Sequence, residues 1–554
     1  MFDHHATFQR AQAACASREC WSPYPEMPRL YPDAETAAPR GEAAFQAMLG
    51  KPFALDLPGV TGWVGEEVSP YRQAPLGITY PQADPQALFA AAKAALPGWA
   101  AADIDTRLML LMEGLDRLYA RLFTLVPAVM HTAGQSYNMA YAGSGVNALD
   151  RGIEALVHAE QAMRSVTPRA EWTRRFGRDE IRLDKTYRLI PRGVAVCFTC
   201  ASFATWNAWP SMLASLATGN AVIVKPHPAS VLPMAITVQV FRDLLAEQGF
   251  DPNLVTLCMD TVADPLGKVL IKHPDCAIVD FTGSARFGQW VEANAHPAIA
   301  FTETSGCNTV VLAGAEDLDA AVRALATTMS LFSAQMCTSP QNVYLPPSVD
   351  TPDGPVPRDV VAAKLADAIA ALTQDPRKAA MILASVQAPQ TLGLIQWVRD
   401  QAKGRVLLDS RAYDHPDFPN ARTATPLLVQ VGKEDRDLYA EERFGPIGFV
   451  IDCDSSEDAL HQATEDARLN GGITGFLYAR DEGFITRAEA AYARAGAQLT
   501  INLTGAMPLN FAAAYSDYHV TGLNGAGNAT LTSLAFVASR FAVTQSRRPT
   551  RTHD

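Results

Sequence analysis

Cysteine is scarce in this sequence, and the few cysteines are not arranged in pairs. Nine of them are spread over 554 residues, an odd number without the dense and even spacing of a disulfide framework. Scattered free thiols are typical of proteins that stay in a reducing compartment. We therefore expect reduced cysteines and a cytoplasmic protein, and we exclude a small secreted fold held together by disulfides.

The sequence also has no long apolar run, and it has fewer basic than acidic residues. No stretch approaches the about 18 apolar residues that a membrane-spanning helix requires. The N-terminal Met-Phe-Asp-His-His lacks the basic start of a secretory signal. Lys and Arg number 46 against 58 Asp and Glu, for a formal net charge of -12. This balance argues against nucleic acid or an anionic membrane as the main partner, and we expect a soluble protein that acts on a small molecule.

A zinc-binding pattern of cysteines or histidines is missing as well. Cys197 and Cys200 form a Cys-x-x-Cys pair on an apolar run, but no second pair lies nearby to complete four ligands. We interpret this pair, and also Cys258, Cys276 and Cys453, as small buried side chains in or beside strands. The sequence predicts no metal site.

The hydrophobic pattern divides the chain into segments. With 554 residues, the chain is too long for a single ordinary core, so two or more domains are expected. Residues 1–80 show no sustained period and are interpreted as an N-terminal arm. The next segment has one apolar helix face, formed by Leu108, Leu111, Leu115, Leu118, Leu122 and Leu125.

From Pro191 onward, short β-rich runs alternate with helical stretches. Such alternation is typical of βαβ units and of parallel sheets that are covered on both faces. The predicted strands are Val194–Thr199, Ala221–Val224, Leu254–Cys258, Ala277–Phe281, Thr309–Leu312, Asn342–Leu345, Leu427–Val431, Gly448–Asp452 and Gly475–Tyr478. The sequence therefore predicts an α/β protein with two blocks that meet near residues 300–310.

One segment between these regions looks like a hairpin. Residues 174–189 carry two alternating runs on either side of Asp184, which predicts a two-stranded excursion. An isolated hairpin is only marginally stable in water, so we expect it to pack against another part of the protein.

Cys337 differs from the other cysteines in its surroundings. It follows a helical run and precedes a strand, within Phe-Ser-Ala-Gln-Met-Cys-Thr-Ser-Pro-Gln at 332–341. A thiol in such a loop can be accessible and can meet backbone N–H donors, as a nucleophile requires. Glu303 lies beside a small-residue turn after an apolar segment, a position suited to a general base.

Several motifs, in order along the chain, resemble the aldehyde dehydrogenase family. The resemblance covers roughly residues 85–545. It is carried by Leu-Ala-Thr-Gly-Asn-Ala-Val-Ile-Val-Lys-Pro at 216–226, Phe-Thr-Gly-Ser at 281–284, Glu-Thr-Ser-Gly at 303–306, Gln-Met-Cys at 335–337 and Glu-Glu-Arg-Phe-Gly-Pro at 441–446. The spacing from Glu303 to Cys337 is also the usual one for this family. Within the family, Thr-Trp-Asn at 205–207 and Val-Lys-Pro-His-Pro at 224–228 look most like the group called phenylacetic acid degradation protein PaaN.

The resemblance implies an oxidoreductase that works through a covalent intermediate. Cys337 would attack an aldehyde and pass through a thiohemiacetal to a thioester, and Glu303 would activate the water that hydrolyses it. The implied fold has a Rossmann-like NAD(P)-binding domain (81–170 and 190–302) and an α/β catalytic domain (303–504). The segments 171–189 and 505–554 would serve oligomerisation, so we expect a homodimer or a dimer of dimers.

The family motifs also imply a cofactor site. Lys225 would bind the adenosine ribose, and a helix N-terminus at Gly283 and Ser284 would face the pyrophosphate. Glu442 would hold the nicotinamide ribose, with Phe444 packed beside the ring.

The position three residues after this lysine departs from the pattern of many NAD-preferring members. They carry a glutamate there that repels a 2′-phosphate, whereas this chain has Pro228. Because Lys225 and His227 would add positive charge nearby, we expect NADP to be used at least as well as NAD.

The oxyanion donor is a second departure. The family places an asparagine at a set distance before the cofactor lysine, and here that position holds Ser202. Asn207 sits in a Trp-Asn pair like that of the family, but five residues later, about 7–8 Å along a helix. Both residues are candidates, and the ungapped spacing from Pro191 to Lys225 favours Ser202.

The chemistry leaves alternatives open. The leading prediction is hydrolytic oxidation of an aldehyde with NAD or NADP, on the PaaN resemblance a CoA-linked semialdehyde from phenylacetate or other aromatic catabolism. A CoA-acylating enzyme is the second possibility, although Glu303 argues against it. A catalytically weak binding homologue is the third, and Ser202 at the donor position is its best support.

Overall fold

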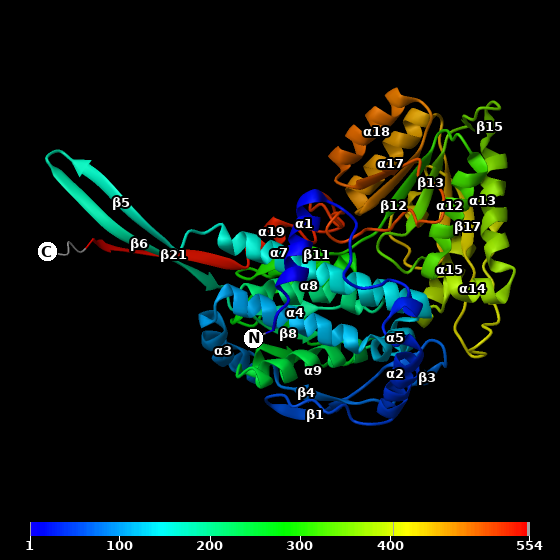
Figure 1. The fold of residues 1–554 in the computed structure, drawn as a ribbon. Coiled ribbons are helices and arrows are strands. Elements are labelled where there is room, and N and C mark those ends of the chain that lie inside the picture. The colour runs from blue at the N-terminus through cyan, green and yellow to red at the C-terminus, as the bar shows by residue number, and fades with distance from the viewer. Residues whose placement is uncertain (1, 403, 551–554) are drawn as a thin grey trace.

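The computed structural model describes residues 2–402 and 404–550 and has two α/β bodies (Figure 1). The first body holds a parallel five-stranded sheet in the order β11-β10-β7-β8-β9. Its strands are β7 (Val194–Phe198), β8 (Ala221–Lys225), β9 (Val255–Leu257), β10 (Cys276–Thr282) and β11 (Ile299–Glu303). Its larger helices are α3 (Pro85–Ala101), α4 (Ile104–Ala120), α5 (Leu122–Ala133), α7 (Ala148–Arg164), α8 (Ala204–Ala217), α9 (Leu232–Glu247) and α11 (Ala285–Asn294).

The second body holds a seven-stranded sheet in the order β16-β17-β18-β13-β12-β19-β20, parallel except at the edge strand β16. Its strands are β12 (Asn308–Leu312), β13 (Pro340–Leu345), β16 (Arg405–Leu408), β17 (Leu427–Gly432), β18 (Ile447–Asp452), β19 (Thr474–Tyr478) and β20 (Gln498–Ile501). The helices around it include α12 (Leu318–Ser330), α13 (Arg358–Thr373), α14 (Pro376–Leu383), α15 (Pro389–Gln401), α17 (Ser456–Asn470) and α18 (Glu482–Ala495). The predicted α/β class is confirmed.

Each predicted strand is present because its β-branched and aromatic residues are buried on both faces of a covered sheet. The six leucines of the predicted apolar face are all buried, although the helix breaks at Arg121 into α4 and α5. Among the described residues, no helix has both the length and the apolar composition needed to cross a bilayer.

Residues 1–80 contain more regular structure than their weak periodicity predicted. They form α1 (His5–Ser17) and α2 (Ala34–Met48) and contribute a strand, β1 (Val60–Val64), that pairs with β4 (Tyr80–Ala83). Phe8 and Phe45 from this segment are buried in the core of the first body. The segment is therefore packed as part of that body.

The predicted hairpin is present, but its turn lies elsewhere. β5 (Arg169–Phe176) and β6 (Asp179–Pro191) are joined at Gly177, whose φ of 64° suits glycine. Asp184, the predicted turn, instead lies within β6 and pairs with Glu171. The C-terminal strand β21 (Phe541–Pro549) adds to the other edge of β6, and the three strands form an arm that projects from the body (Figure 1).

Candidate active site

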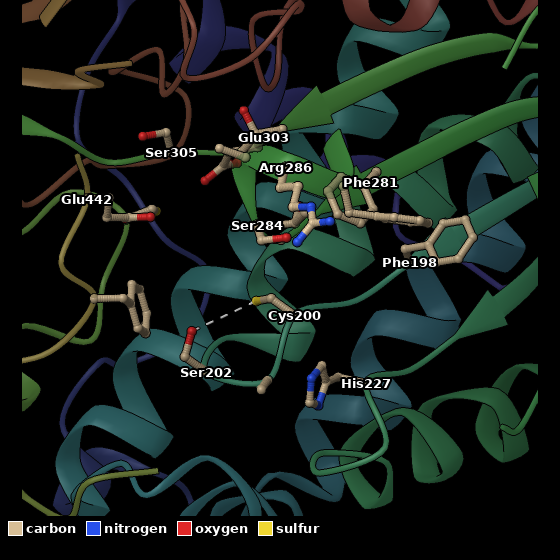
Figure 2. Close-up of a pocket in the computed structure, with 18 of the residues that line it drawn as sticks. Phe198, Cys200, Ser202, His227, Phe281, Ser284, Arg286, Glu303, Ser305 and Glu442 are labelled. Carbon is tan, nitrogen blue, oxygen red and sulfur yellow. Dashed lines mark hydrogen bonds between the residues drawn. The ribbon is translucent and has the colours of Figure 1, made fainter. Parts of the chain in front are cut away.

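A cavity of about 940 Å³ lies where strands of the first sheet end, facing the second body. Parallel sheets commonly bind ligands at the carboxyl ends of their strands. Its lining includes Ser202, Lys225, His227, Pro228, Gly283, Ser284, Glu303, Cys337, Glu442 and Phe444. Figure 2 shows Ser202, His227, Ser284, Glu303 and Glu442 around this space. The fold therefore brings most of the predicted site residues to one cavity.

A second cavity of about 340 Å³ meets the first at Cys337. Phe203, Asn207 and Cys337 line both cavities. The remaining lining of the second is largely apolar, with three amides and one acid, and contains no Lys or Arg: Glu26, Ser136, Asn138, Met139, Ala142, Gly143, Asn147, Trp206, Leu331, Met336, Thr338, Met381, Pro508, Asn510, Phe511, Ala512 and His519. Cys337 thus stands at the junction of a larger and a smaller compartment.

Cys337 is held by an unusual turn between α12 and β13. Phe332, Ser333 and Ala334 all have φ near 50°, a left-handed conformation that costs energy for residues other than glycine and is common at functional sites. Gly306 lies against this loop so closely that a Cβ there would be 2.0 Å from the carbonyl oxygen of Cys337. This close approach explains why the turn after Glu303 contains glycine.

Glu303, the last residue of β11, is buried and hydrogen-bonded. Its Oε2 accepts from Nδ2 of Asn207 at 2.9 Å, and its Oε1 lies 2.9 Å from Nε2 of His519. Burial alone would raise the pKa of Glu303, but His519, the Cys337 thiol and Asn207 together hold it below its usual value. The side chain is therefore an ionised acceptor beside Cys337.

The pKa of the Cys337 thiol is shifted in the opposite direction from that of Glu303. Burial and the neighbouring Glu303 carboxylate raise the pKa of the Cys337 thiol well above its ordinary value. Its Sγ lies 3.5 Å from Nε2 of His519. A nucleophilic thiolate at this position needs both a proton acceptor and a donor that stabilises it.

The structure favours Asn207 over Ser202 beside the reacting groups. α8 begins at Ala204, after the loop at 199–203, so Asn207 lies in the first turn of the helix. Its amide reaches Glu303, whereas the Ser202 hydroxyl contacts only the Cys200 thiol, at 4.0 Å, and lies across the cavity from Glu303 (Figure 2). The contact with Glu303 makes Asn207 the better-placed candidate, and which of the two residues serves the oxyanion stays a prediction.

The Cys-x-x-Cys pair also needs correction. Cys197 is buried in β7 as expected, but Cys200 lies beyond the end of the strand and lines the large cavity. The other thiols interpreted as structural, Cys258, Cys276 and Cys453, are buried.

Lys225 ends β8 and lies in the large cavity, but its charge is already paired. Its Nζ is 2.6 Å from Oδ1 of Asp260, and both side chains are buried. Burial and the neighbouring Lys225 lower the pKa of His227, so His227 adds no positive charge at neutral pH. The expected preference for NADP relied on free positive charge at these two residues, and the structure removes that support.

The remaining cofactor candidates also line the large cavity. Gly283 and Ser284 lead into α11, and the Ser284 side chain does not cap the helix, which leaves its N-terminal N–H groups for a ligand. Glu442 and Phe444 approach from the second body. Burial, and secondarily Glu303, raises the pKa of Glu442 to about 8.

His519 and Asp260 were missed by the sequence analysis. His519 lies 182 residues from Cys337, in a segment without regular structure that was assigned to oligomerisation. Asp260 follows β9 in a loop. Neither residue belongs to a motif, so no local signal marked them.

Known proteins match over most of the chain. The model of the aldehyde dehydrogenase family matches residues 65–508. A crystal structure of an NAD-dependent aldehyde dehydrogenase from Burkholderia multivorans superposes with a TM-score of 0.96 and 42% identity, over 100% of both chains. Vanillin dehydrogenase from a Pseudomonas strain is 27% identical, over 72% of this chain and 77% of its own. The match to 4-trimethylaminobutyraldehyde dehydrogenase B of Danio rerio is 24% identical and covers 50% of this chain and just over half (53%) of that relative.

Proposed function

Because the chain belongs to the aldehyde dehydrogenase family, we propose that it oxidises an aldehyde to the acid through a thioester on Cys337, with NAD or NADP as cofactor. The observation that carries this proposal is the convergence of Cys337, Glu303 and Asn207 at the junction of a cofactor-sized and a substrate-sized cavity. Three separate segments of the chain supply these groups.

The large cavity fits a dinucleotide. Its volume of about 940 Å³ lies at the upper end for small-molecule sites. The open N-terminus of α11, at Gly283 and Ser284, would bind the pyrophosphate. Lys225 would bind the adenosine ribose, and Glu442 and Phe444 would hold the nicotinamide end. When bound, the cofactor supplies the hydride acceptor.

The chain's own residues then perform the remaining chemistry. The Cys337 thiolate adds to the aldehyde carbon, and the oxygen that becomes negative is stabilised by Nδ2 of Asn207 and the backbone N–H of Cys337. Once the thioester has formed, Glu303 takes a proton from a water molecule, which attacks the thioester carbon and releases the acid. Asn207 has to turn from Glu303 toward the oxyanion during this sequence.

The small cavity favours an uncharged aldehyde. Its lining is mainly apolar and has no Lys or Arg to bind an anion, while Glu26 would repel one. An aromatic aldehyde fits this lining, and the likeness to a vanillin dehydrogenase supports that class. The semialdehyde linked to CoA, proposed from the PaaN resemblance, is the second candidate, because its phosphates would have to stay outside this cavity.

Two other functions are less well supported. A CoA-acylating enzyme would release the acyl group to a thiol, but Glu303 is present and ionised beside Cys337, as hydrolysis requires. A binding homologue without catalysis would not need Asn207 placed against the catalytic base.

The test is NAD(P)H formation with a panel of aldehydes, each measured with and without CoA. We expect turnover of vanillin and benzaldehyde without CoA, and much weaker turnover of succinic semialdehyde, which carries a carboxylate. Turnover that requires CoA would show the acylating function instead. Tight binding without NAD(P)H formation would show the binding homologue.

A further inference from the structure

One ring nitrogen of His519 reaches both reacting side chains of the site. Nε2 lies 2.9 Å from Oε1 of Glu303 and 3.5 Å from Sγ of Cys337. The ring is buried, with 3% of its side chain exposed. The proposed function uses Cys337 and Glu303 but assigns nothing to this third group.

The position of His519 is fixed by a buried network. Arg151 and Glu154 on α7 form a fully buried ion pair. Arg151 donates to the backbone oxygen of Asp517, two residues before His519, and Glu154 accepts from the backbone N–H of Tyr515. The His519 ring also packs edge-on against Trp206, with ring centroids 4.7 Å apart. Trp206 precedes Asn207, so two neighbours on α8 hold His519 and Glu303 in place.

The short contact with Glu303 dictates where the histidine proton lies. A carboxylate oxygen and a bare ring nitrogen would repel each other at 2.9 Å, so a proton must sit between them. With Glu303 ionised, Nε2 carries the proton and donates it to Oε1. The same Nε2 lies 3.5 Å from the sulfur of Cys337.

We propose that His519 is a further catalytic residue, whose Nε2–H stabilises the Cys337 thiolate when the thiol proton passes to Glu303. The proton leaves Sγ, the sulfur keeps the electron pair, and the proton joins a carboxylate oxygen of Glu303. The Nε2–H, which had donated to the carboxylate, then donates to the thiolate. Glu303 passes its proton to solvent through the cavity before it serves the hydrolytic water.

The surroundings make such a donor necessary. Burial and Glu303, followed by Cys200 and Glu442, raise the pKa of the Cys337 thiol. Glu26 faces the same small cavity as His519. The cation Arg151 and the His519 ring both pack against the Trp206 ring, and among the described residues no hydrogen bond joins Arg151 to the sulfur or to His519. Among these neighbours, His519 is the group with an N–H within reach of the sulfur.

This inference rests on Cys337 being the nucleophile of the proposed function, but its test needs neither aldehyde nor cofactor. Iodoacetamide alkylates a thiolate by displacing iodide, and mass spectrometry of peptides measures the rate at Cys337, with the exposed Cys20 as internal reference. The variants are His519→Phe, which removes the donor, and His519→Gln, which keeps one. The matched control is His273→Phe, because His273 is also a buried histidine, stacked on Phe89.

At pH 7.5 we expect His519→Phe to slow alkylation of Cys337 at least about tenfold, equivalent to about 1.36 kcal/mol, with Cys20 unchanged. In His519→Gln the alkylation rate of Cys337 should stay within about threefold of the wild-type rate, and in His273→Phe it should equal the wild-type rate. Circular dichroism checks the fold, and His519→Leu replaces the Phe variant if that one does not fold. If Cys337 is alkylated at the wild-type rate in the His519→Phe or His519→Leu variant, the proposal is overturned. Equal slowing in the Gln variant overturns the donor role, because an amide then fails to substitute.

The result is also independent of the proposed function. Normal, His519-dependent alkylation without aldehyde oxidation would leave this inference standing and refute the proposed function. Aldehyde oxidation that proceeds normally in His519→Phe, with unchanged alkylation, would refute this inference alone.

Discussion

Lys225 and Asp260 form a buried ion pair, with Nζ and Oδ1 2.6 Å apart, on the wall of the cofactor-sized cavity. The carboxylate neutralises the one lysine that the sequence motif places near the adenosine ribose. With Pro228 at this position, no glutamate is there to repel a 2′-phosphate. However, neither Lys225 nor His227 offers a free positive charge to attract one. We therefore expect NAD to be used at least as efficiently as NADP.

Asp260→Asn should shift the cofactor preference toward NADP. The substitution frees the Lys225 ammonium, and a charge-assisted hydrogen bond to a 2′-phosphate is worth about 1.5–3 kcal/mol, or about tenfold or more. The measurement is the ratio of kcat/KM for NADP to that for NAD. Asp264→Asn, an exposed carboxylate in the same loop, is the control and should leave the ratio unchanged. An unchanged ratio in Asp260→Asn would mean that Lys225 does not face the ribose.

Glu303→Gln should separate acylation from hydrolysis. A general base contributes about 10²–10⁴-fold to its step, so the steady-state rate should fall by about that factor. The burst of NAD(P)H should become slower but keep an amplitude of about one per site, because the thiolate still forms by losing its proton to solvent. Stopped-flow absorbance measures both phases, and the exposed Glu316, changed to Gln, is the control. Loss of the burst amplitude would contradict the assigned role.

Glu442 should make the free enzyme less stable as the pH rises. Its pKa in the folded state is about 8, above the ordinary value near 4.5. Between these values the folded chain keeps a proton that the unfolded chain has lost, so stability falls with rising pH and the loss is complete above pH 8. Glu442→Gln should therefore raise Tm relative to the wild type at pH 8.5 but much less at pH 5. Glu441→Gln, the exposed neighbour, should show no such pH dependence, and a pH-independent difference for Glu442→Gln would refute the assignment.

The projecting arm should hold two chains together. Phe176, Ile181, Ile190 and Val543 expose large apolar side chains on β5, β6 and β21, and an exposed apolar sheet favours association. We expect a dimer or a dimer of dimers for the wild type, and Ile181→Asp should produce a smaller species by light scattering at micromolar concentration. Val262→Asp, at an even more exposed apolar position on the body, should leave the oligomer unchanged. A monomeric wild type would contradict this expectation.

The parts predictable from sequence were those set by local pattern. Strands such as β8 and β18 are short, mainly apolar runs, and their burial on both faces follows from that composition. The pairing of Glu303 with Cys337 was predicted from the two family motifs and their spacing, and in the structure Glu303 ends β11 while Cys337 precedes β13. The edge strands β11, β16 and β20 were not predicted, since they are short and none is buried along its whole length.

The parts that could not be predicted depend on loops. Whether Ser202 or Asn207 meets Glu303 is decided by the path of residues 199–203, which no periodicity encodes. His519 and Asp260 act through contacts with residues distant in sequence, inside irregular segments. The expected use of NADP lost its support for the same reason, because the partner of Lys225, Asp260, lies in a loop after β9; the cofactor preference itself stays a prediction.

The central claim is that Cys337 carries the acyl group, and mass spectrometry of quenched enzyme tests it most directly. Glu303→Gln is mixed with NAD and vanillin, quenched in acid during the steady state, digested and analysed. We predict one acyl group on the peptide that contains Cys337, in near-stoichiometric amount, and none in the Cys337→Ala variant. A protein that forms NADH with no acyl adduct, or with the adduct on another cysteine such as Cys200, would contradict the account.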